Sequence, residues 1–364
     1  MSKKSCEDFF DKLKCSLYSS YGGHFSRLVG VPVCAELCLL HRIKILPLIY
    51  FKILLHFCQS GFILLRGKVG FTLETRQKKR GDRFDGYWLR DEVPAMNQFM
   101  GYLLPNRADN EAFIRQEIDL RPMDAFLAKK NAGLEKDKYS YFHVILAACV
   151  KCFVLRPRMN RFISGNRIYQ RDHISVAFVV KKRFEDSSSE GLAYKRYTGD
   201  DTIDTLHASI LEEIYQCRRT DVEDNSNAFM QKLMRLPCWL LRIVVKILFK
   251  LDRKGKVPYD IIRTDPNYAS IFLTNLGSIG LDAGYHHLNN WGTNSFFGVI
   301  GKRHLAPEWH EDGSCTVRPV LDLGLTLDER IGDGFYYSGT VRLLRKLLEN
   351  PELLEQPFST EVEY

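Results

Sequence analysis

The chain has 364 residues, of which 45% are hydrophobic and 26% are charged, and it carries a formal net charge of +8. This is the ordinary balance of a globular protein with enough residues for a full core, so we expect one large domain and an extension. The basic residues are interspersed with acidic ones and no aromatic-basic motif accompanies them, which argues against a nucleic-acid partner.

The cysteines do not suggest a disulfide framework, because ten of them are spread over a long chain. No signal peptide with a small-residue cleavage site precedes them, so we expect a cytoplasmic protein, with peripheral attachment to a membrane left open. Cys149 and Cys152 form a CxxC pair inside the apolar-periodic segment YSYFHVILAACVKCFVL, which also holds His143. No second pair at zinc-finger spacing occurs, so we expect buried thiols, a buried core histidine and no metal.

Residues 1–76 are expected to form a hydrophobic N-terminal extension. Within it, residues 45–65 make an apolar run about as long as a membrane span requires. Lys52 and His56 interrupt the run, and a lysine near mid-membrane costs about 2.5–3.5 kcal/mol on insertion scales. Three alternatives therefore stay open: a weak span or interfacial hairpin, a helix packed on the main domain, or a segment that forms no structure.

Residues 77–364 are expected to form an α/β domain. The segment 112–120 alternates apolar and polar residues as a half-buried strand does. Helices are expected over 121–132, over 139–157, where Pro157 ends the helix, and over 201–219. A Gly-Asn hairpin at 165–166 feeds a β-branched strand. Further strands are expected within 268–280, 294–304 and 315–330, followed by a closing helix over 335–354.

The segment at about 237–253 is expected to form a basic amphipathic helix. Arg242, Lys246, Lys250 and Arg253 are three or four residues apart and share one face, while Leu, Ile, Val and Phe fill the others. Such a helix commonly lies at an anionic membrane surface, with Trp239 at the headgroup level. The alternatives are a helix that caps the domain and a contact between copies of the chain.

Two motifs in the C-terminal part carry a resemblance to a known family. LTNLGSIG (273–280) is similar to a Ser/Thr-Asn-Leu-Gly turn, and LTLDERIGDG (325–334) is similar to a strand-end motif Asp-His-Arg-x-x-Asp-Gly. Together they resemble the catalytic domain shared by chloramphenicol acetyltransferase and the dihydrolipoyl acyltransferase cores of 2-oxo acid dehydrogenase complexes, from about residue 80 to the end. The resemblance implies an α/β two-layer sandwich, with a mixed sheet and helices on one face. It also implies a homotrimer with active sites between subunits.

The resemblance further implies a reaction in which an acyl group moves between coenzyme A and a thiol or hydroxyl acceptor. In that family a histidine takes the acceptor's proton, a Ser/Thr hydroxyl stabilises the oxyanion, and the aspartate before glycine orients the turn through an arginine. Carried over, the hydroxyl is that of Thr274, and the matching turn residues are Asp328, Arg330, Asp333 and Gly334. Glu329 stands where the family has its histidine, so the proton-transfer step is altered.

Glu329 has two interpretations. A carboxylate buried among apolar groups has a raised pKa and can serve as a base near neutral pH, so Glu329 could act in a dry channel. Alternatively, it pairs with Arg330 or a neighbouring arginine, and the protein is inactive. His286 and His287 offer another base, because they follow the Thr274 turn and histidine titrates near neutral pH.

These residues predict a coenzyme A-dependent acyltransferase with an altered base, with Glu329, Thr274 and Asp333 as site residues. Acyl-coenzyme A would be a cosubstrate, no lipoyl group is expected on the chain, and the acceptor would be a small or lipid-like molecule. The alternative is an inactive trimeric protein of the same fold that binds a ligand or a membrane surface.

Overall fold

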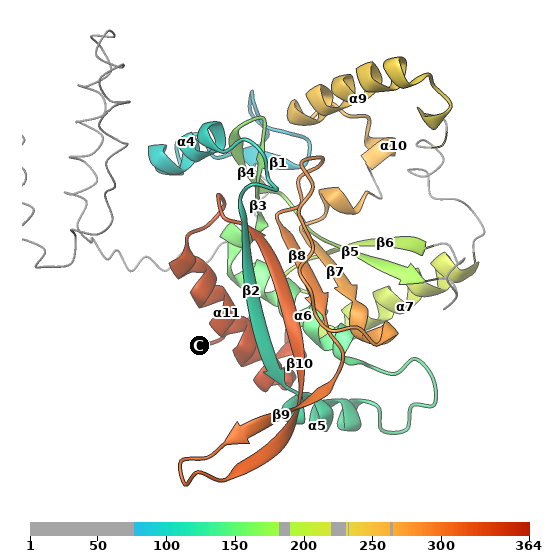
Figure 1. Ribbon diagram of the computed structural model, residues 1–364, viewed down its shortest axis with the longest axis vertical. Coiled ribbons are helices and arrows are strands. Elements are labelled where there is room, and N and C mark those ends of the chain that lie inside the picture. The colour runs from blue at the N-terminus through green and yellow to red at the C-terminus, as the bar shows by residue number, and fades with distance from the viewer. Residues whose placement is uncertain (1–75, 182–189, 220–230, 232, 263–264) are drawn as a thin grey trace, which may run out of the picture. The chain divides into compact units, whose positions relative to one another are not determined.

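The computed structural model describes residues 76–181, 190–219, 231, 233–262 and 265–364, which belong to one compact unit, Gly70–Tyr364 (Figure 1). The expected N-terminal extension, up to residue 75, and the run at residues 45–65 lie outside the described residues. In the ranges that the structure describes, no helix combines the length and apolar character needed to cross a bilayer. The same ranges contain no cluster of three or more His, Cys, Asp or Glu side chains suited to a metal ion.

A mixed β-sheet organises the unit (Figure 1). The described residues place its strands in the order β2-β10-β8-β7-β5-β6, with β9 pairing along β10. β7 runs parallel to both β5 and β8, and the other neighbours are antiparallel. The strands are β2 (Glu111–Asp119), β5 (Ile174–Lys181), β6 (Glu190–Tyr197), β7 (Ile271–Asn275), β8 (Phe296–Ile300), β9 (His304–Trp309) and β10 (Cys315–Asp328).

One face of this sheet is covered by helices, and the core lies between the two layers (Figure 1). The helices are α5 (Arg121–Lys130), α6 (Tyr141–Leu155), α7 (Ile203–Arg219) and α11 (Gly334–Glu349). Along β10, Leu323, Leu325 and Leu327 join the core, so the alternate residues Gly324 and Thr326 face the opposite side. The expected two-layer sandwich with a mixed sheet and helices on one face is therefore confirmed.

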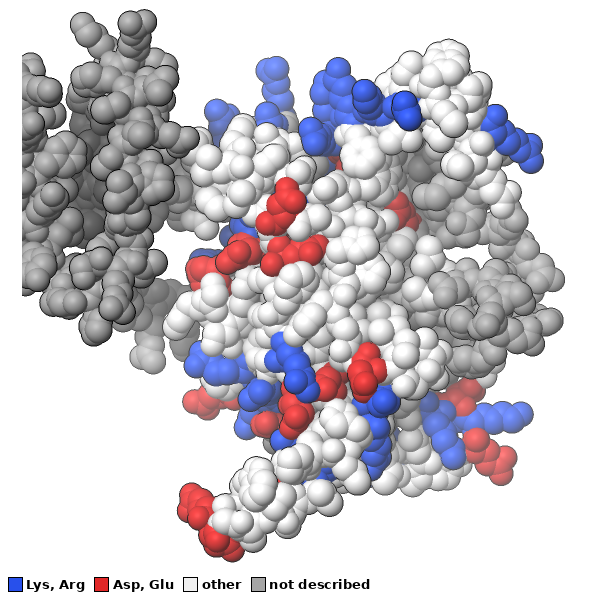
Figure 2. All heavy atoms as spheres, viewed as in Figure 1, with Lys and Arg blue, Asp and Glu red and all other residues white. Residues whose placement is uncertain are grey.

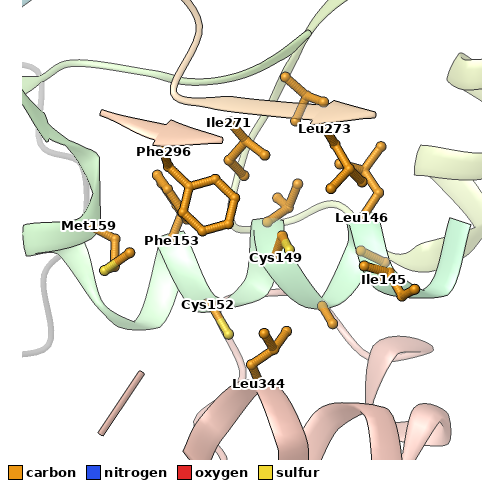
Figure 3. Close-up of a cluster of buried hydrophobic side chains, with 14 of the residues drawn as sticks. Ile145, Leu146, Cys149, Cys152, Phe153, Met159, Ile271, Leu273, Phe296 and Leu344 are labelled. Carbon is orange, nitrogen blue, oxygen red and sulfur yellow. The ribbon is translucent and has the colours of Figure 1, made fainter. Parts of the chain in front are cut away.

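Helix α6 is deeply buried, since every residue from His143 to Phe153 is buried. It lies between strands and helix α11, with Phe153 near Phe296 on one side and Cys152 towards Leu344 on the other (Figure 3). Burial raises the pKa of the Cys149 thiol to about 12, and that of Cys152 is raised for the same reason. Both are free and buried, so the prediction of buried helical thiols is confirmed.

A second group of elements gathers at one end of the sheet (Figure 1). It contains a small antiparallel sheet in the order β1-β4-β3 and three helices. The predicted helix at 237–253 is confirmed as α9, whereas β1 and α4 were not predicted. The elements are β1 (Gly86–Trp88), α4 (Ala95–Leu103), β3 (Arg161–Ser164), β4 (Arg167–Arg171), α9 (Cys238–Arg253) and α10 (Tyr259–Ile262).

Candidate active site

The turn that follows β10 is built around a buried ion pair. Asp328 is fully buried and accepts hydrogen bonds from Arg330, at 2.8 Å from Nε and 2.7 Å from Nη2. A second buried guanidinium, that of Arg107, has its Nε 3.6 Å from the same carboxylate. Charges this deeply buried remain ionised only when paired and hydrogen-bonded, so the turn is held by electrostatics as well as by packing.

Distant segments converge on this ion pair. Arg107 donates to the carbonyl oxygens of Ile163 and Gly292, and burial lowers its pKa to about 10. Arg330 donates to the carbonyl oxygen of Leu104 at 2.8 Å. The Tyr337 hydroxyl of α11 donates to the Asp328 carbonyl oxygen at 2.6 Å. The backbone on both sides of residue 329 is therefore fixed.

Glu329 itself is exposed, between the buried Asp328 and Arg330. Its backbone N–H donates to the Asn110 carbonyl oxygen at 2.8 Å, and no ion pair of the described residues includes its carboxylate. The alternative interpretation pairs Glu329 with Arg330 or a neighbouring arginine; the structure does not show the pair with Arg330, because Asp328 occupies that guanidinium. Nor does a single copy of the chain supply the dry channel that a glutamate base requires.

Asp333 has a structural role that differs from the one implied by the resemblance. Its side chain accepts a hydrogen bond from the Tyr336 backbone N–H at 2.8 Å, so it is the N-cap of α11. The implied contact with an arginine is made by Asp328 instead. A carboxylate at an N-cap satisfies an unpaired backbone donor and is favoured by the helix dipole. Asp333 therefore positions the helix that supplies Tyr337.

Thr274 lies near the end of β7, where it is half-buried. Ile271 and Leu273 join the helix-side core, so Phe272 and Thr274 face the side of the sheet that has no helices. A short 3-10 helix, Leu276–Ile279, follows, and the Asn275 side chain caps it by accepting from the Ser278 N–H at 3.2 Å. This turn fixes where the hydroxyl stands.

The structure does not bring Thr274 and Glu329 together within one chain. Thr274 is in register with Val299 of β8, which is opposite Gly324 of β10. Glu329 lies five residues further along the chain, which corresponds to about 17 Å, and two strands away, which adds about 10 Å sideways. The two residues are therefore about 20 Å apart, and a site that uses both needs a second copy.

The histidine loop lies nearer to Thr274. The His286 ring stacks on Phe297 with centroids 4.2 Å apart, and Phe297 is opposite Phe272, two residues before Thr274. Gly324 permits this close approach, since a Cβ there would lie 2.0 Å from the Gly284 carbonyl oxygen. His286 Nδ1 donates to the His287 carbonyl oxygen at 2.9 Å, which leaves Nε2 with the lone pair that a base needs.

One important residue, Arg107, was missed in the sequence. It lies in the segment LLPNRADN, which shows neither helical nor strand periodicity, and its partners come from three other segments. A buried arginine that bonds mainly to backbone carbonyls leaves no local pattern. Only the acid at position 328, which needs a cation when buried, hinted that such a residue exists.

Comparisons with known proteins give similarities of fold only. No protein-family model matches the chain, and no curated protein matches its sequence. A probable dihydrolipoamide acetyltransferase of Listeria monocytogenes is 14% identical over 70% of this chain and 89% of its own, with a TM-score of 0.46. The dihydrolipoamide acetyltransferase of Azotobacter vinelandii is 16% identical over 80% and 99%, with a TM-score of 0.46. A chloramphenicol acetyltransferase is 14% identical over 72% and 99%, with a TM-score of 0.44. The reaction has to be argued from the chain's own residues.

Proposed function

We propose that this chain is an acyltransferase that moves an acyl group from a coenzyme A thioester to a thiol or hydroxyl acceptor, either a small or a lipid-like molecule. The observation that supports it most is the turn after β10. There a buried pair, Asp328 and Arg330, holds an exposed ionisable residue, Glu329, at a fixed point. A buried ion pair adds little net stability, so its use here is better explained by positioning.

The proposed site lies between copies of the chain. Because about 20 Å separates Thr274 from Glu329 within one chain, Glu329 of one copy would meet Thr274 of the next. We propose a homotrimer with three such sites. Contact with a neighbour would also remove water from the exposed Glu329 carboxylate, and desolvation raises the pKa of a carboxyl group towards the range of a useful base.

In this site, the Glu329 carboxylate accepts the proton of the acceptor's thiol or hydroxyl as its sulfur or oxygen attacks the thioester carbonyl carbon. Thr274 donates its hydroxyl hydrogen to the oxyanion that forms. As the carbon–sulfur bond breaks, Glu329 returns the proton to the leaving thiolate. Acyl-coenzyme A supplies the activated acyl group. Beside the Thr274 turn, the Lys302 N–H donates to the Leu281 carbonyl oxygen, and its exposed side chain, which also pairs with Asp282, would meet the phosphate groups, because cations suit phosphates.

His286 is the alternative base, and it would act within one chain. It lies on the same face as Thr274, and its Nε2 carries the free lone pair. The two bases differ in a testable way. Glu329→Gln lowers kcat/KM by about a hundredfold or more if Glu329 is the base, whereas His286→Gln does so if the histidine is. Thr274→Val should lower it by about a hundredfold or more in either case, since it removes the oxyanion donor.

The assay measures acyl transfer from acetyl-coenzyme A, or hydrolysis of its thioester. The signal is the free thiol of coenzyme A that either reaction releases. Glu311→Gln and His310→Gln are the matched controls, because both side chains are exposed on the β9–β10 hairpin. Full activity in all three site variants would refute the proposal. An inactive protein that binds coenzyme A in calorimetry, and gains activity in Glu329→His, would instead support the ligand-binding alternative.

The state of the cysteines bears on the cellular compartment. The buried Cys149 and Cys152 are free thiols, which suits the reducing cytoplasm that we propose for this protein.

A further inference from the structure

Helix α9 is attached to the rest of the unit mainly through its C-terminal end. Asp252 is its one buried residue, and it accepts from the Tyr268 hydroxyl at 2.6 Å and from the Gly292 N–H at 3.2 Å. Phe249 packs edge-on against Trp291, with ring centroids 5.6 Å apart. Although most of its sixteen residues are apolar, none of the apolar ones is fully buried. The helix therefore presents apolar surface that the described unit does not cover.

The exposed side of α9 combines charge with large apolar side chains. Arg242, Lys246 and Lys250 form an exposed row along the helix. At 100° per residue, Trp239 falls within this row and Ile243 beside it. Trp239 is 65% exposed and Ile243 47% exposed. Contact of large apolar side chains with water is unfavourable, and burying them lowers the free energy, so a partner should cover them.

Helix α4 adds a second apolar stripe at the same end. Phe99 and Tyr102 are three residues apart and are 53% and 59% exposed. The two helices flank one turn, between β3 and β4: a Cβ on Gly101 would lie 2.8 Å from the Asn166 carbonyl oxygen, and a Cβ on Gly165 would lie 2.6 Å from the Arg253 carbonyl oxygen. Both helices therefore lie at one end of the unit (Figure 1).

This end is strongly basic. Lys and Arg side chains project along it in the space-filling view (Figure 2). The sequence from 235 to 256 holds one acid, Asp252, whose carboxylate points inward to Tyr268 and Gly292. The exposed basic residues of this stretch are Arg235, Arg242, Lys246, Lys250, Arg253, Lys254 and Lys256.

We infer that α9 and α4 together form a docking surface for an anionic lipid bilayer. A bilayer satisfies both features at once, because its headgroups attract the basic row and its acyl region accepts Trp239, Ile243 and Phe99. A nucleic acid or an acidic protein segment would match the charge but leave the apolar residues in water. The inference does not depend on the proposed reaction.

The docking surface also adjoins the candidate site. Arg330 donates to the Leu104 carbonyl oxygen at the end of α4, and the Glu329 N–H donates to the Asn110 carbonyl oxygen. Docking through α4 and α9 would therefore hold the turn that carries Glu329 close to the lipid headgroups. This placement suits an acceptor that partitions into the bilayer.

The test is co-sedimentation of the full chain with vesicles of phosphatidylcholine alone and of phosphatidylcholine with 30% phosphatidylserine. The readout is the partition coefficient for the phosphatidylserine vesicles divided by that for the phosphatidylcholine vesicles. Binding that does not depend on lipid charge contributes to both coefficients and does not raise this ratio. We expect about a tenfold or higher ratio that falls in high salt, and a loss of most of it in the triple variant Arg242→Gln, Lys246→Gln, Lys250→Gln. The matched control, Lys129→Gln, Lys136→Gln, Lys138→Gln, makes the same charge change at exposed lysines elsewhere and should keep the ratio.

A second measurement does not depend on the charge variants. Brominated lipids should quench the tryptophan fluorescence of the wild-type chain more than that of Trp239→Phe, since Trp239 would enter the interface. Trp309→Phe, which changes the 73% exposed tryptophan of β9, is its control and should retain the quenching. Equal binding to both vesicle types, an unchanged ratio in the triple variant, or binding to RNA in preference to vesicles would each overturn the inference.

Discussion

At the scale of single residues, the turn after β10 is dominated by charges that have no access to water. Asp328 balances two guanidinium groups, those of Arg330 and Arg107, and no water-exposed alternative is open to any of the three. Removing one partner of such a group leaves the other charges buried and unpaired, which costs far more than the pair gains when intact. The Asp328 carboxylate therefore contributes both to the stability of the fold and to the position of Glu329.

Asp328→Asn should lower the free energy of unfolding by about 3–5 kcal/mol, because asparagine leaves both arginines without a counter-charge. Urea denaturation followed by circular dichroism measures this. The control is Glu92→Gln, which breaks the exposed ion pair between Arg76 and Glu92 and should cost less than about 1 kcal/mol. A cost for Asp328→Asn as small as the control's would mean that water reaches the pair.

At the scale of elements, helix α6 begins with a capping arrangement between the exposed Ser140 and the buried His143. The Ser140 N–H donates to His143 Nδ1 at 3.1 Å, three residues into the helix, and the pair forms a capping box. Burial, with a smaller effect of the nearby His207, lowers the pKa of His143 to about 3. The histidine expected in the core, His143, is therefore both buried and neutral. Protonating it in the folded state would cost free energy.

This neutrality predicts how stability depends on pH. Between about pH 6.5 and pH 3 the unfolded chain binds a proton at His143 and the folded chain does not, so the free energy of unfolding falls as pH falls through this window. By pH 5 the loss from this residue should reach about 2 kcal/mol. His143→Gln keeps a capping side chain and should lose about that much less stability between pH 7 and pH 5, as measured by urea titrations.

His310→Gln changes an exposed histidine and is the control, which should behave as the wild-type chain. Equal losses in all three would show that His143 is protonated in the folded state.

At the scale of the whole molecule, the periodic patterns in the sequence predicted the elements of the two layers but not the peripheral ones, such as helix α4. The alternation in β2 and β10 and the apolar periods of α6 and α11 were sufficient, because each buries one face against a common core. Helix α4 was missed because Pro94 precedes it, no side chain caps it, and its apolar residues remain exposed. The hairpin of β9 did leave a signal, the Asp312-Gly313 turn, with Gly313 at φ 79°.

In the candidate site, too, the sequence predicted local features but not the contacts between distant segments. Motif spacing predicted that Thr274 and the turn at 325–334 lie at strand ends, and this is confirmed. Spacing could not show that Arg107 completes the turn or that His286 covers Phe297, because these contacts join segments far apart in the chain. It also could not show that about 20 Å separates Thr274 from Glu329 within one chain.

That distance leads to a prediction about assembly. If each site takes Thr274 from one copy and Glu329 from the next, then Thr274→Val and Glu329→Gln chains are each inactive alone but complement one another in mixed trimers. Every trimer purified through both tags contains both chains, and one of its three sites pairs an intact Thr274 with an intact Glu329, so the purified mixture should regain about a third of the wild-type rate. The two chains are co-expressed with different affinity tags, purified through both tags and assayed with acetyl-coenzyme A. A mixture of Thr274→Val with a chain that carries both substitutions is the control and should remain inactive, because no Thr274 is intact in either chain. Mixed trimers of the two single variants that also remain inactive would refute a site shared between copies. A Glu329→Gln chain that is active alone would instead place the chemistry within one chain, with His286 as the base.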